Sequence, residues 1–159
     1  MKSACAHEGE AAGMPARELA AALVAAESRC ASAEERLTGP RRRVLELLLE
    51  SGAPVKAYDL IAAYGPHGEA AKPPTVYRAL EFLERLGFAH RIESLNAYVP
   101  CRHEAEEHRA AFLICECCGA AQEFEPDFEA QLAAARQAGY QVRAVTLEAR
   151  GLCAACRHG

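Results

Sequence analysis

The sequence predicts an α+β protein in two parts, a helical half that ends in a β-hairpin and a smaller β-α-β half. Three observations lead to this class. Four segments with helical apolar periodicity come first, and two short extended segments follow them. Beyond residue 101 the pattern changes to β-α-β. Five of the eight cysteines crowd into the last 45 of the 159 residues, which marks the second half as chemically different.

The helical half is predicted from apolar stripes and from the signals at their ends. The four predicted helices span residues 15–35, 38–51, 57–64 and 73–86. The stripe of the first helix consists of Leu19, Leu23, Ala26, Cys30 and Ala33. A threonine and a proline open the second helix with a capping hydroxyl and a first-turn ring, and Gly52 ends it. Its expected buried face is Val44, Leu47 and Leu48.

The fourth helix has two distinct faces and leads into the hairpin. Its apolar face is Val76, Ala79, Leu80, Leu83 and Leu86, and Gly87 stops it. The extended segments 88–92 and 97–100 follow, with a turn at 94–96. Three helices followed by a hairpin is the order of a winged helix-turn-helix.

The charge balance gives only a weak indication of a nucleic-acid partner. The formal net charge of the whole chain is −4, so any basic surface must be local. Residues 38–91 carry 8 Lys and Arg against 6 Asp and Glu, whereas residues 101–159 carry 6 against 9. This asymmetry has the sign expected of a DNA-binding first half.

The second half is predicted as strands at 111–114 and 121–124, a helix at 126–138 and a strand at 140–148. The helix is expected to bury Phe128, Leu132 and Ala135. We therefore divide the chain into three parts. They are a winged-helix domain over 1–98 with a flexible start at 1–14, a hinge over 99–108, and a second domain over 109–159.

The compartment bears on how the cysteines are interpreted. The apolar run at 19–26 is too short to span a bilayer, and the acidic start lacks the basic region of a signal peptide. We expect a cytoplasmic protein, in which thiols stay reduced, so structural disulfides are not the expected use of eight cysteines.

Two C-x₂-C pairs are the most specific motif in the chain. Cys115 and Cys118 form the first pair, Cys153 and Cys156 form the second, and 34 residues separate them. Such pairs are typical of a tetrahedral site with four thiolates around Zn²⁺, because one tight turn aims two thiolates at one metal. Cys117 competes with Cys118, which we prefer because it gives the two-residue spacing and precedes a glycine. A redox dithiol is the alternative.

A second, looser set of ligand-type residues surrounds the hairpin and the first strand after it. It consists of His90, Cys101, His108 and Glu123. Taken singly, each of these residues is also an ordinary surface residue. Spacing alone therefore leaves open whether they form a site.

Several longer motifs together resemble one family. They are Ala71-Lys-Pro-Pro-Thr-Val-Tyr-Arg-Ala-Leu80, Gly87-Phe-Ala-His90, Glu93-Ser94 with Asn96 and Tyr98, the first cysteine pair with Gly119, and Gly151-Leu-Cys-Ala-Ala-Cys156. With these motifs the chain resembles the ferric-uptake-regulator superfamily, and within it the zinc-uptake-regulator (Zur) branch, over about residues 37–156.

This resemblance implies an N-terminal winged-helix DNA-binding domain, a C-terminal α/β dimerisation domain and two Zn²⁺ ions per protomer. The implied structural ligands are Cys115, Cys118, Cys153 and Cys156. The implied regulatory ligands are His90, Cys101, His108 and Glu123. The implied DNA contacts are Tyr58 and Arg78, supported by Lys72 and Tyr77. We further expect Thr75 in the major groove and Arg41 and Arg42 on phosphates, with a solvated face as the alternative for at least one of these arginines.

The implied function is a zinc-dependent dimeric repressor of zinc-uptake genes that binds a palindromic operator. Iron- and peroxide-sensing relatives carry a His-rich run where this chain has Cys101, and a thiolate suits Zn²⁺ better than iron. An iron-, manganese- or peroxide-responsive regulator and a C-x₂-C redox switch remain alternatives. No enzyme is expected, because no nucleophile-base-orienter set is present. The acidic linker and the C-terminal tail are expected to be solvated, and an accessory metal site is the alternative for their residues. These residues are His103, Glu104, Glu106, Glu107 and His158.

Overall fold

The computed structural model describes residues 13–101, 109–142 and 145–157. These residues form two compact units, one ending at Cys101 and the other beginning beyond it. The predicted hinge at 99–108 contains this division, and most of the hinge lies outside the described residues. Among the described helices, none is both long and apolar enough to cross a membrane.

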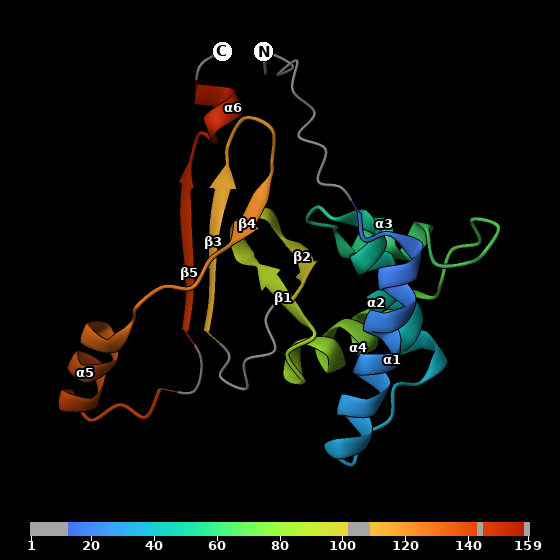
Figure 1. Ribbon diagram of the computed structural model, residues 1–159, viewed down its shortest axis with the longest axis horizontal. Helices are drawn as coiled ribbons and strands as arrows, with labels where there is room; N and C mark the ends of the chain where they lie inside the picture. The colour runs from blue at the N-terminus through green and yellow to red at the C-terminus, as the bar shows by residue number, and fades with distance from the viewer. Residues whose placement is uncertain (1–12, 102–108, 143–144, 158–159) are drawn as a thin grey trace. The chain divides into compact units, whose positions relative to one another are not determined.

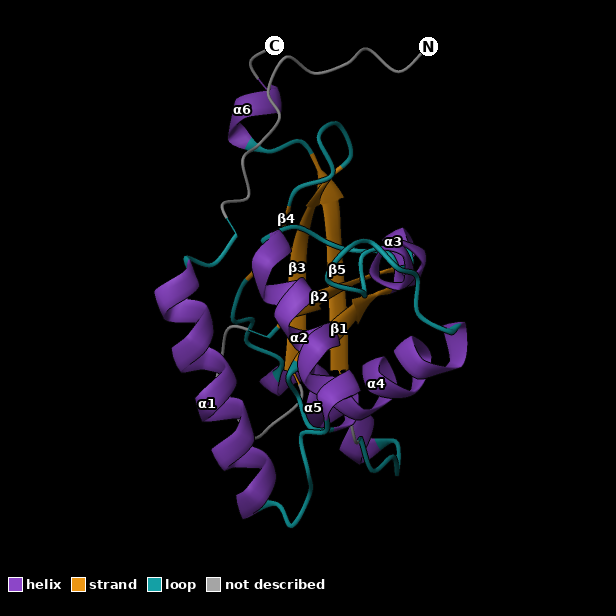
Figure 2. Ribbon diagram, turned by 90° about the vertical axis from the view of Figure 1, so that its right-hand side faces the viewer, coloured by secondary structure: helices purple, strands orange, loops and turns teal. Residues whose placement is uncertain are grey.

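The first unit is a winged helix-turn-helix preceded by an additional helix (Figure 1). Its elements are α1 (Ala16–Ser32), α2 (Gly39–Ser51), α3 (Ala57–Ala62), α4 (Pro73–Arg85), β1 (Ala89–Ile92), a 3₁₀ turn η1 (Glu93–Leu95) and β2 (Ala97–Pro100). The helix α2 packs against α1 and α4, and α3 packs against α4 (Figure 2). One apolar core joins all four helices to the start of the hairpin.

The hairpin is closed by a turn that needs a left-handed residue. Asn96 takes a φ of 47° between η1 and β2, a conformation that asparagine tolerates better than most residues. The strands then pair antiparallel, with His90 opposite Val99. Val55 adds a third, short extended segment by exchanging backbone hydrogen bonds of 2.9 and 2.7 Å with Tyr98.

The second unit is a three-stranded sheet with the order β4-β3-β5. Its elements are β3 (Arg109–Cys115), β4 (Ala121–Glu123), α5 (Glu129–Gln137), β5 (Val145–Gly151) and α6 (Ala154–Arg157). The strands β3 and β4 are antiparallel, whereas β3 and β5 are parallel. One small core cluster consists of Ala111, Phe128 and Leu132, flanked by Phe124 and Val145, and Phe112 and Ile114 of β3 are also buried. Figure 1 shows α6 at the end of the sheet where β3 and β5 terminate.

The predicted class and the order of elements are confirmed, but several details of the helices were wrong. The first helix ends at Ser32, because Glu34 adopts a left-handed φ of 56°, and Ala33 is exposed. Thr38 precedes α2, but its hydroxyl makes no capping hydrogen bond. In α2, Leu45 and Leu49 are buried, whereas Leu47 is only half-buried.

The fourth and fifth helices also differ in their buried faces. In α4, Phe82 is buried, although it was not assigned to the apolar face. Leu86 was assigned to the apolar face, but it is half-buried and ends the helix. In α5, Phe128 and Leu132 are buried as expected, and Ala135 is half-buried.

The predicted strand at 140–148 was wrong at both ends. The helix α5 ends in a Schellman motif, in which Gly139 has a φ of 84° and the Tyr140 N–H donates to the Ala135 carbonyl oxygen over 3.0 Å. Tyr140 thus belongs to the end of the helix and is 72% exposed. The described strand runs from Val145 to Gly151, and the short helix α6 that follows was not predicted.

Candidate metal centre and DNA interface

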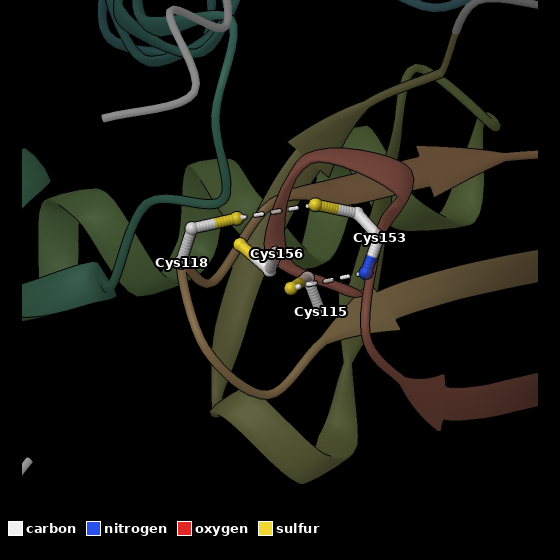
Figure 3. Close-up of side chains that lie close together, drawn as sticks. All are labelled: Cys115, Cys118, Cys153 and Cys156. Atoms are coloured by element: carbon white, nitrogen blue, oxygen red, sulfur yellow. Dashed lines mark hydrogen bonds between the residues drawn. The ribbon is translucent and has the colours of Figure 1, made fainter. Parts of the chain in front are cut away.

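Four cysteine thiols converge at one end of the second unit. The Sγ atoms of Cys115, Cys118, Cys153 and Cys156 all lie within 4.8 Å of one another. Figure 3 shows the four sulfurs directed toward a common centre, with 3.9 Å between those of Cys118 and Cys153. Four ligands at a Zn–S distance of about 2.3 Å in a tetrahedron lie about 3.8 Å apart. The cluster therefore has the dimensions of a four-thiolate zinc site.

The parallel pairing of β3 and β5 explains how two distant cysteine pairs meet. Cys115 lies opposite Gly151 at the carboxyl ends of both strands, and the Glu116 N–H donates to the Gly151 carbonyl oxygen over 2.8 Å. The turn after Cys115 closes through Gly119, whose φ of 75° favours a residue without Cβ. This turn brings Cys118 into the cluster, whereas the exposed Cys117 is not one of the four.

The second pair is positioned by α6, which the sequence analysis missed. The first turn of this helix places Cys156 near Cys153, with the Cys156 N–H donating to the Cys153 carbonyl oxygen over 3.1 Å. The C-x₂-C motif itself was the signal for a helical turn at this point. Cys115 and Cys156 are buried, and Cys118 and Cys153 are half-buried.

Backbone amides prepare one of these thiols for ionisation. The Cys153 N–H donates to the Cys115 sulfur over 3.4 Å. Together with the N–H groups of Cys118 and Cys117, this bond lowers the pKa of Cys115 to about 6. The pKa of Cys156 is raised to about 12, first by its hydrogen bond with Cys153 and then by burial. A divalent cation bound among the four sulfurs would stabilise their thiolate forms.

Two of the four predicted regulatory ligands come together within the first unit. His90 is the second residue of β1, and Cys101 directly follows β2. A ring nitrogen of His90 and the sulfur of Cys101 lie within 4.8 Å of each other, and both residues are half-buried. The Cys101 N–H donates to the Phe88 carbonyl oxygen over 2.9 Å, which holds Cys101 beside β1.

The other two predicted regulatory ligands belong to the second part of the chain. Glu123 is the last residue of β4 and is half-buried. His108 lies outside the described residues, as do the accessory candidates His103, Glu104, Glu106, Glu107 and His158.

The predicted DNA-contact residues lie on the exposed faces of α3 and α4. Lys72 precedes α4 and is exposed, Thr75 is half-buried in the first turn, and Arg78 is exposed one turn later. Two large aromatic side chains accompany them, since Tyr77 is 53% and Tyr58 75% exposed. Exposed tyrosines beside basic residues at a helix start suit contacts to phosphates and base edges.

Arg41 and Arg42, the predicted phosphate contacts, also make contacts within the first unit. The Arg41 guanidinium stacks on the Phe82 ring at 3.5 Å from its centroid and donates to the Arg36 carbonyl oxygen over 2.6 Å. Arg42 pairs with Glu27 of α1. Both side chains are engaged in holding α2 to its neighbours, a use that charge counting along the sequence does not reveal.

The fold and the cysteine cluster define a winged-helix protein with an appended four-cysteine module. A model of the ferric uptake regulator family matches residues 32–150. The zinc uptake regulation protein of Escherichia coli strain K12 is 44% identical over 138 residues, which are 84% of this chain and 80% of that protein. The chain belongs to the ferric uptake regulator family, as the motifs predicted.

Solved structures of zinc uptake regulators have the same fold. A zinc uptake regulator complexed with zinc and DNA is 39% identical with a TM-score of 0.82, covering 88% of this chain and 95% of that one. The holo form of XcZur is 45% identical with a TM-score of 0.78, covering 87% and 99%.

Proposed function

We propose that this protein is a zinc-responsive, DNA-binding transcriptional repressor of zinc-uptake genes. The observation that carries the proposal is the similarity to zinc uptake regulators along most of the chain, including one solved with zinc and DNA. The four-thiol cluster and the exposed recognition face of α4 are the features of this chain that such a function requires.

The first proposed zinc site is structural and consists of the four clustered cysteines. Its role follows from the small core of the second unit, whose large buried side chains among the described residues are Phe112, Ile114, Phe128 and Leu132. A unit with so few large buried side chains depends on another source of stability, and a four-thiolate metal provides it directly.

The second proposed zinc site is regulatory and gives the expected total of two ions per protomer. We assign it to His90 and Cys101 of the first unit, and to His108 and Glu123 of the second part of the chain. One thiolate and one carboxylate balance the charge of one divalent cation. Because these ligands come from both sides of the division after Cys101, their shared use would restrict the hinge and favour one arrangement of the DNA-binding units. A coupling of about 1–3 kcal/mol per site is sufficient for such a response.

The proposed DNA-reading element is α4, with Arg78 positioned to contact a guanine edge in the major groove. A dimer presents two such helices, and a palindromic operator matches them when they are about 34–36 Å apart. We include Tyr58, Lys72, Thr75 and Tyr77 as supporting contacts.

The second unit has the features expected of a dimerisation surface. In the described part of the chain, β5 is an edge strand of the sheet. Three large apolar side chains remain substantially exposed on or beside it, namely Leu113, Leu147 and Leu152. An open edge and uncovered leucines together favour pairing with a second copy of the chain.

Other functions of the same fold differ in the metal ion or oxidant to which the protein responds. A manganese-, iron- or peroxide-responsive regulator would share the winged helix and the cysteine cluster, but Cys101 favours zinc at the second site. A redox switch would use the C-x₂-C pairs without metal. We propose a cytoplasmic regulator and no enzymatic activity.

The test is metal analysis combined with DNA binding. We expect two zinc ions per protomer and tight binding to a palindromic operator in the presence of zinc. Mild chelation should remove one ion and the operator preference together, while the dimer persists. Equal operator binding before and after chelation, or a response to iron or manganese but not to zinc, would contradict the proposal.

A further inference from the structure

Helix α1 lies outside the helix-turn-helix, yet one of its side chains reaches the end of the recognition helix. The Arg29 guanidinium donates a hydrogen bond to the carbonyl oxygen of Leu86, the residue that ends α4. Carbonyl groups at the end of a helix lack partners within the helix, and a cationic donor there is favoured by the helix dipole. Arg29 therefore acts as a C-terminal cap supplied by another helix.

The same guanidinium also holds the residue that connects the recognition helix to the hairpin. It lies over the Phe88 ring at 4.3 Å from the centroid, within the range of a cation–π contact. The Phe88 N–H donates to the Leu83 carbonyl oxygen over 2.8 Å, and the Phe88 carbonyl oxygen accepts from the Cys101 N–H over 2.9 Å. Phe88 thus joins α4 to the hairpin, which carries His90 and is followed by Cys101, and Arg29 covers this junction.

A second set of contacts joins the same end of α4 to the segment after α1. Glu35 pairs with Arg85 over 2.7 Å and lies 3.9 Å from Arg41. Both arginines flank the buried Phe82 ring, with the guanidinium carbon of Arg41 3.5 Å and that of Arg85 5.4 Å from its centroid. The last two turns of α4 are therefore held from α1, from the α1–α2 connection and from α2.

We propose that Arg29 is a positioning residue for DNA recognition, because it fixes the orientation of α4 at the junction with β1. This inference rests on the proposed function and adds to it a determinant of operator preference that lies outside the helix-turn-helix. The half-buried Arg29 has its guanidinium engaged by Leu86 and Phe88, so its effect on DNA is indirect.

The test compares Arg29→Met with Arg17→Met in the full-length, zinc-loaded protein. Methionine keeps the length and apolar packing of the arginine stem and removes the donor and the charge. Arg17 is an exposed residue of the same helix, so its substitution removes the same charge and controls for the loss of electrostatic attraction to DNA. Each variant is titrated with an operator and with a non-specific duplex of equal length at one salt concentration.

We expect two changes in Arg29→Met. Its preference for the operator over non-specific DNA should fall by about tenfold, as is typical when a hydrogen bond from a charged group is lost. Exchange of the backbone amide hydrogens of Leu86, Gly87 and Phe88 should become faster in the absence of DNA. These amides donate hydrogen bonds to carbonyl oxygens of α4, and the hydrogen bonds open more often when Arg29 no longer holds the end of the helix. Arg17→Met should show neither change.

Only the combination of both changes supports the proposal. A weaker preference without faster exchange would indicate a direct DNA contact, and faster exchange with a normal preference would indicate a purely structural role; each overturns it. If Arg29→Met does not fold, Arg29→Lys against Arg17→Lys provides the same comparison, because lysine loses the planar fork. If the wild-type protein itself shows no zinc-dependent operator preference, the proposed function fails, and exchange alone then decides whether Arg29 holds the helix end.

Discussion

Replacement of Cys153 by serine is the most direct test of the cysteine cluster. The change removes one of four converging thiols and the sulfur that lies 3.9 Å from that of Cys118. A serine hydroxyl stays protonated at neutral pH and is a poor zinc ligand. We therefore expect Cys153→Ser to lose the structural zinc ion.

The size of the effect follows from the core of the second unit. The four large side chains buried in its described part, Phe112, Ile114, Phe128 and Leu132, each contribute about 1.5–3 kcal/mol by leaving water, or about 6–12 kcal/mol together. A structural zinc site contributes about 10–16 kcal/mol in small domains. Since the metal is the larger contribution, its loss should unfold the second unit. The first unit has its own core of four helices and should remain folded.

The assay combines metal content, amide NMR spectra and sedimentation. Cys153→Ser should contain one zinc ion fewer per protomer, lose the dispersed signals of β3 and β5, and sediment as a monomer. Cys117→Ser is the matched control, because it changes an exposed cysteine in the same turn and leaves all four clustered cysteines. A Cys153→Ser protein that stays dimeric with full zinc content would refute the reasoning, and the same defect in both variants would show that Cys117 is a ligand.

Three further substitutions test separate parts of the molecule. Arg78→Ala should weaken operator binding by about 1–3 kcal/mol at constant salt, with zinc content and dimerisation unchanged; unchanged affinity would exclude α4 as the reading helix. Cys101→Ser should leave a folded dimer with one zinc ion per protomer, whose operator affinity matches that of chelated wild type; a normal zinc titration would exclude Cys101 as a sensor ligand. Burial raises the pKa of the half-buried Glu84, so its charge costs stability above that pKa. Glu84→Gln should therefore raise the melting temperature slightly at pH 7, and this advantage should disappear as the pH falls toward the ordinary glutamate pKa; an advantage independent of pH would contradict this origin.

Local signals in the sequence were sufficient for most of the first unit. The stripe Leu19, Leu23, Ala26 and Cys30 is buried as predicted, because one face of a helix follows directly from spacings of three and four residues. The order of the helices and the hairpin was likewise predictable from apolar periodicity and from the residues that begin and end each helix. The prediction of a strand at 140–148 was wrong because Gly139 and Tyr140 belong to the end of α5. Alternation along a short segment does not distinguish a strand from the end of a helix.

The cysteine pairs were evident in the sequence, since spacing within each pair is a local property. Their convergence depends on the parallel register of β3 and β5, which places Cys115 opposite Gly151 and is not encoded near either pair. The proximity of His90 and Cys101 likewise follows from the register of β1 and β2.

The arginines show most clearly what only the tertiary structure decided. As sequence, Arg29, Arg41 and Arg42 are interchangeable positive charges on two amphipathic helices. In the folded unit, Arg29 reaches Leu86 and Phe88, Arg41 stacks on Phe82, and Arg42 pairs with Glu27. Composition and periodicity determined that such residues would lie on helices, because those preferences are local. Which group each arginine contacts depended on partners far along the chain, and only packing brings those partners within reach.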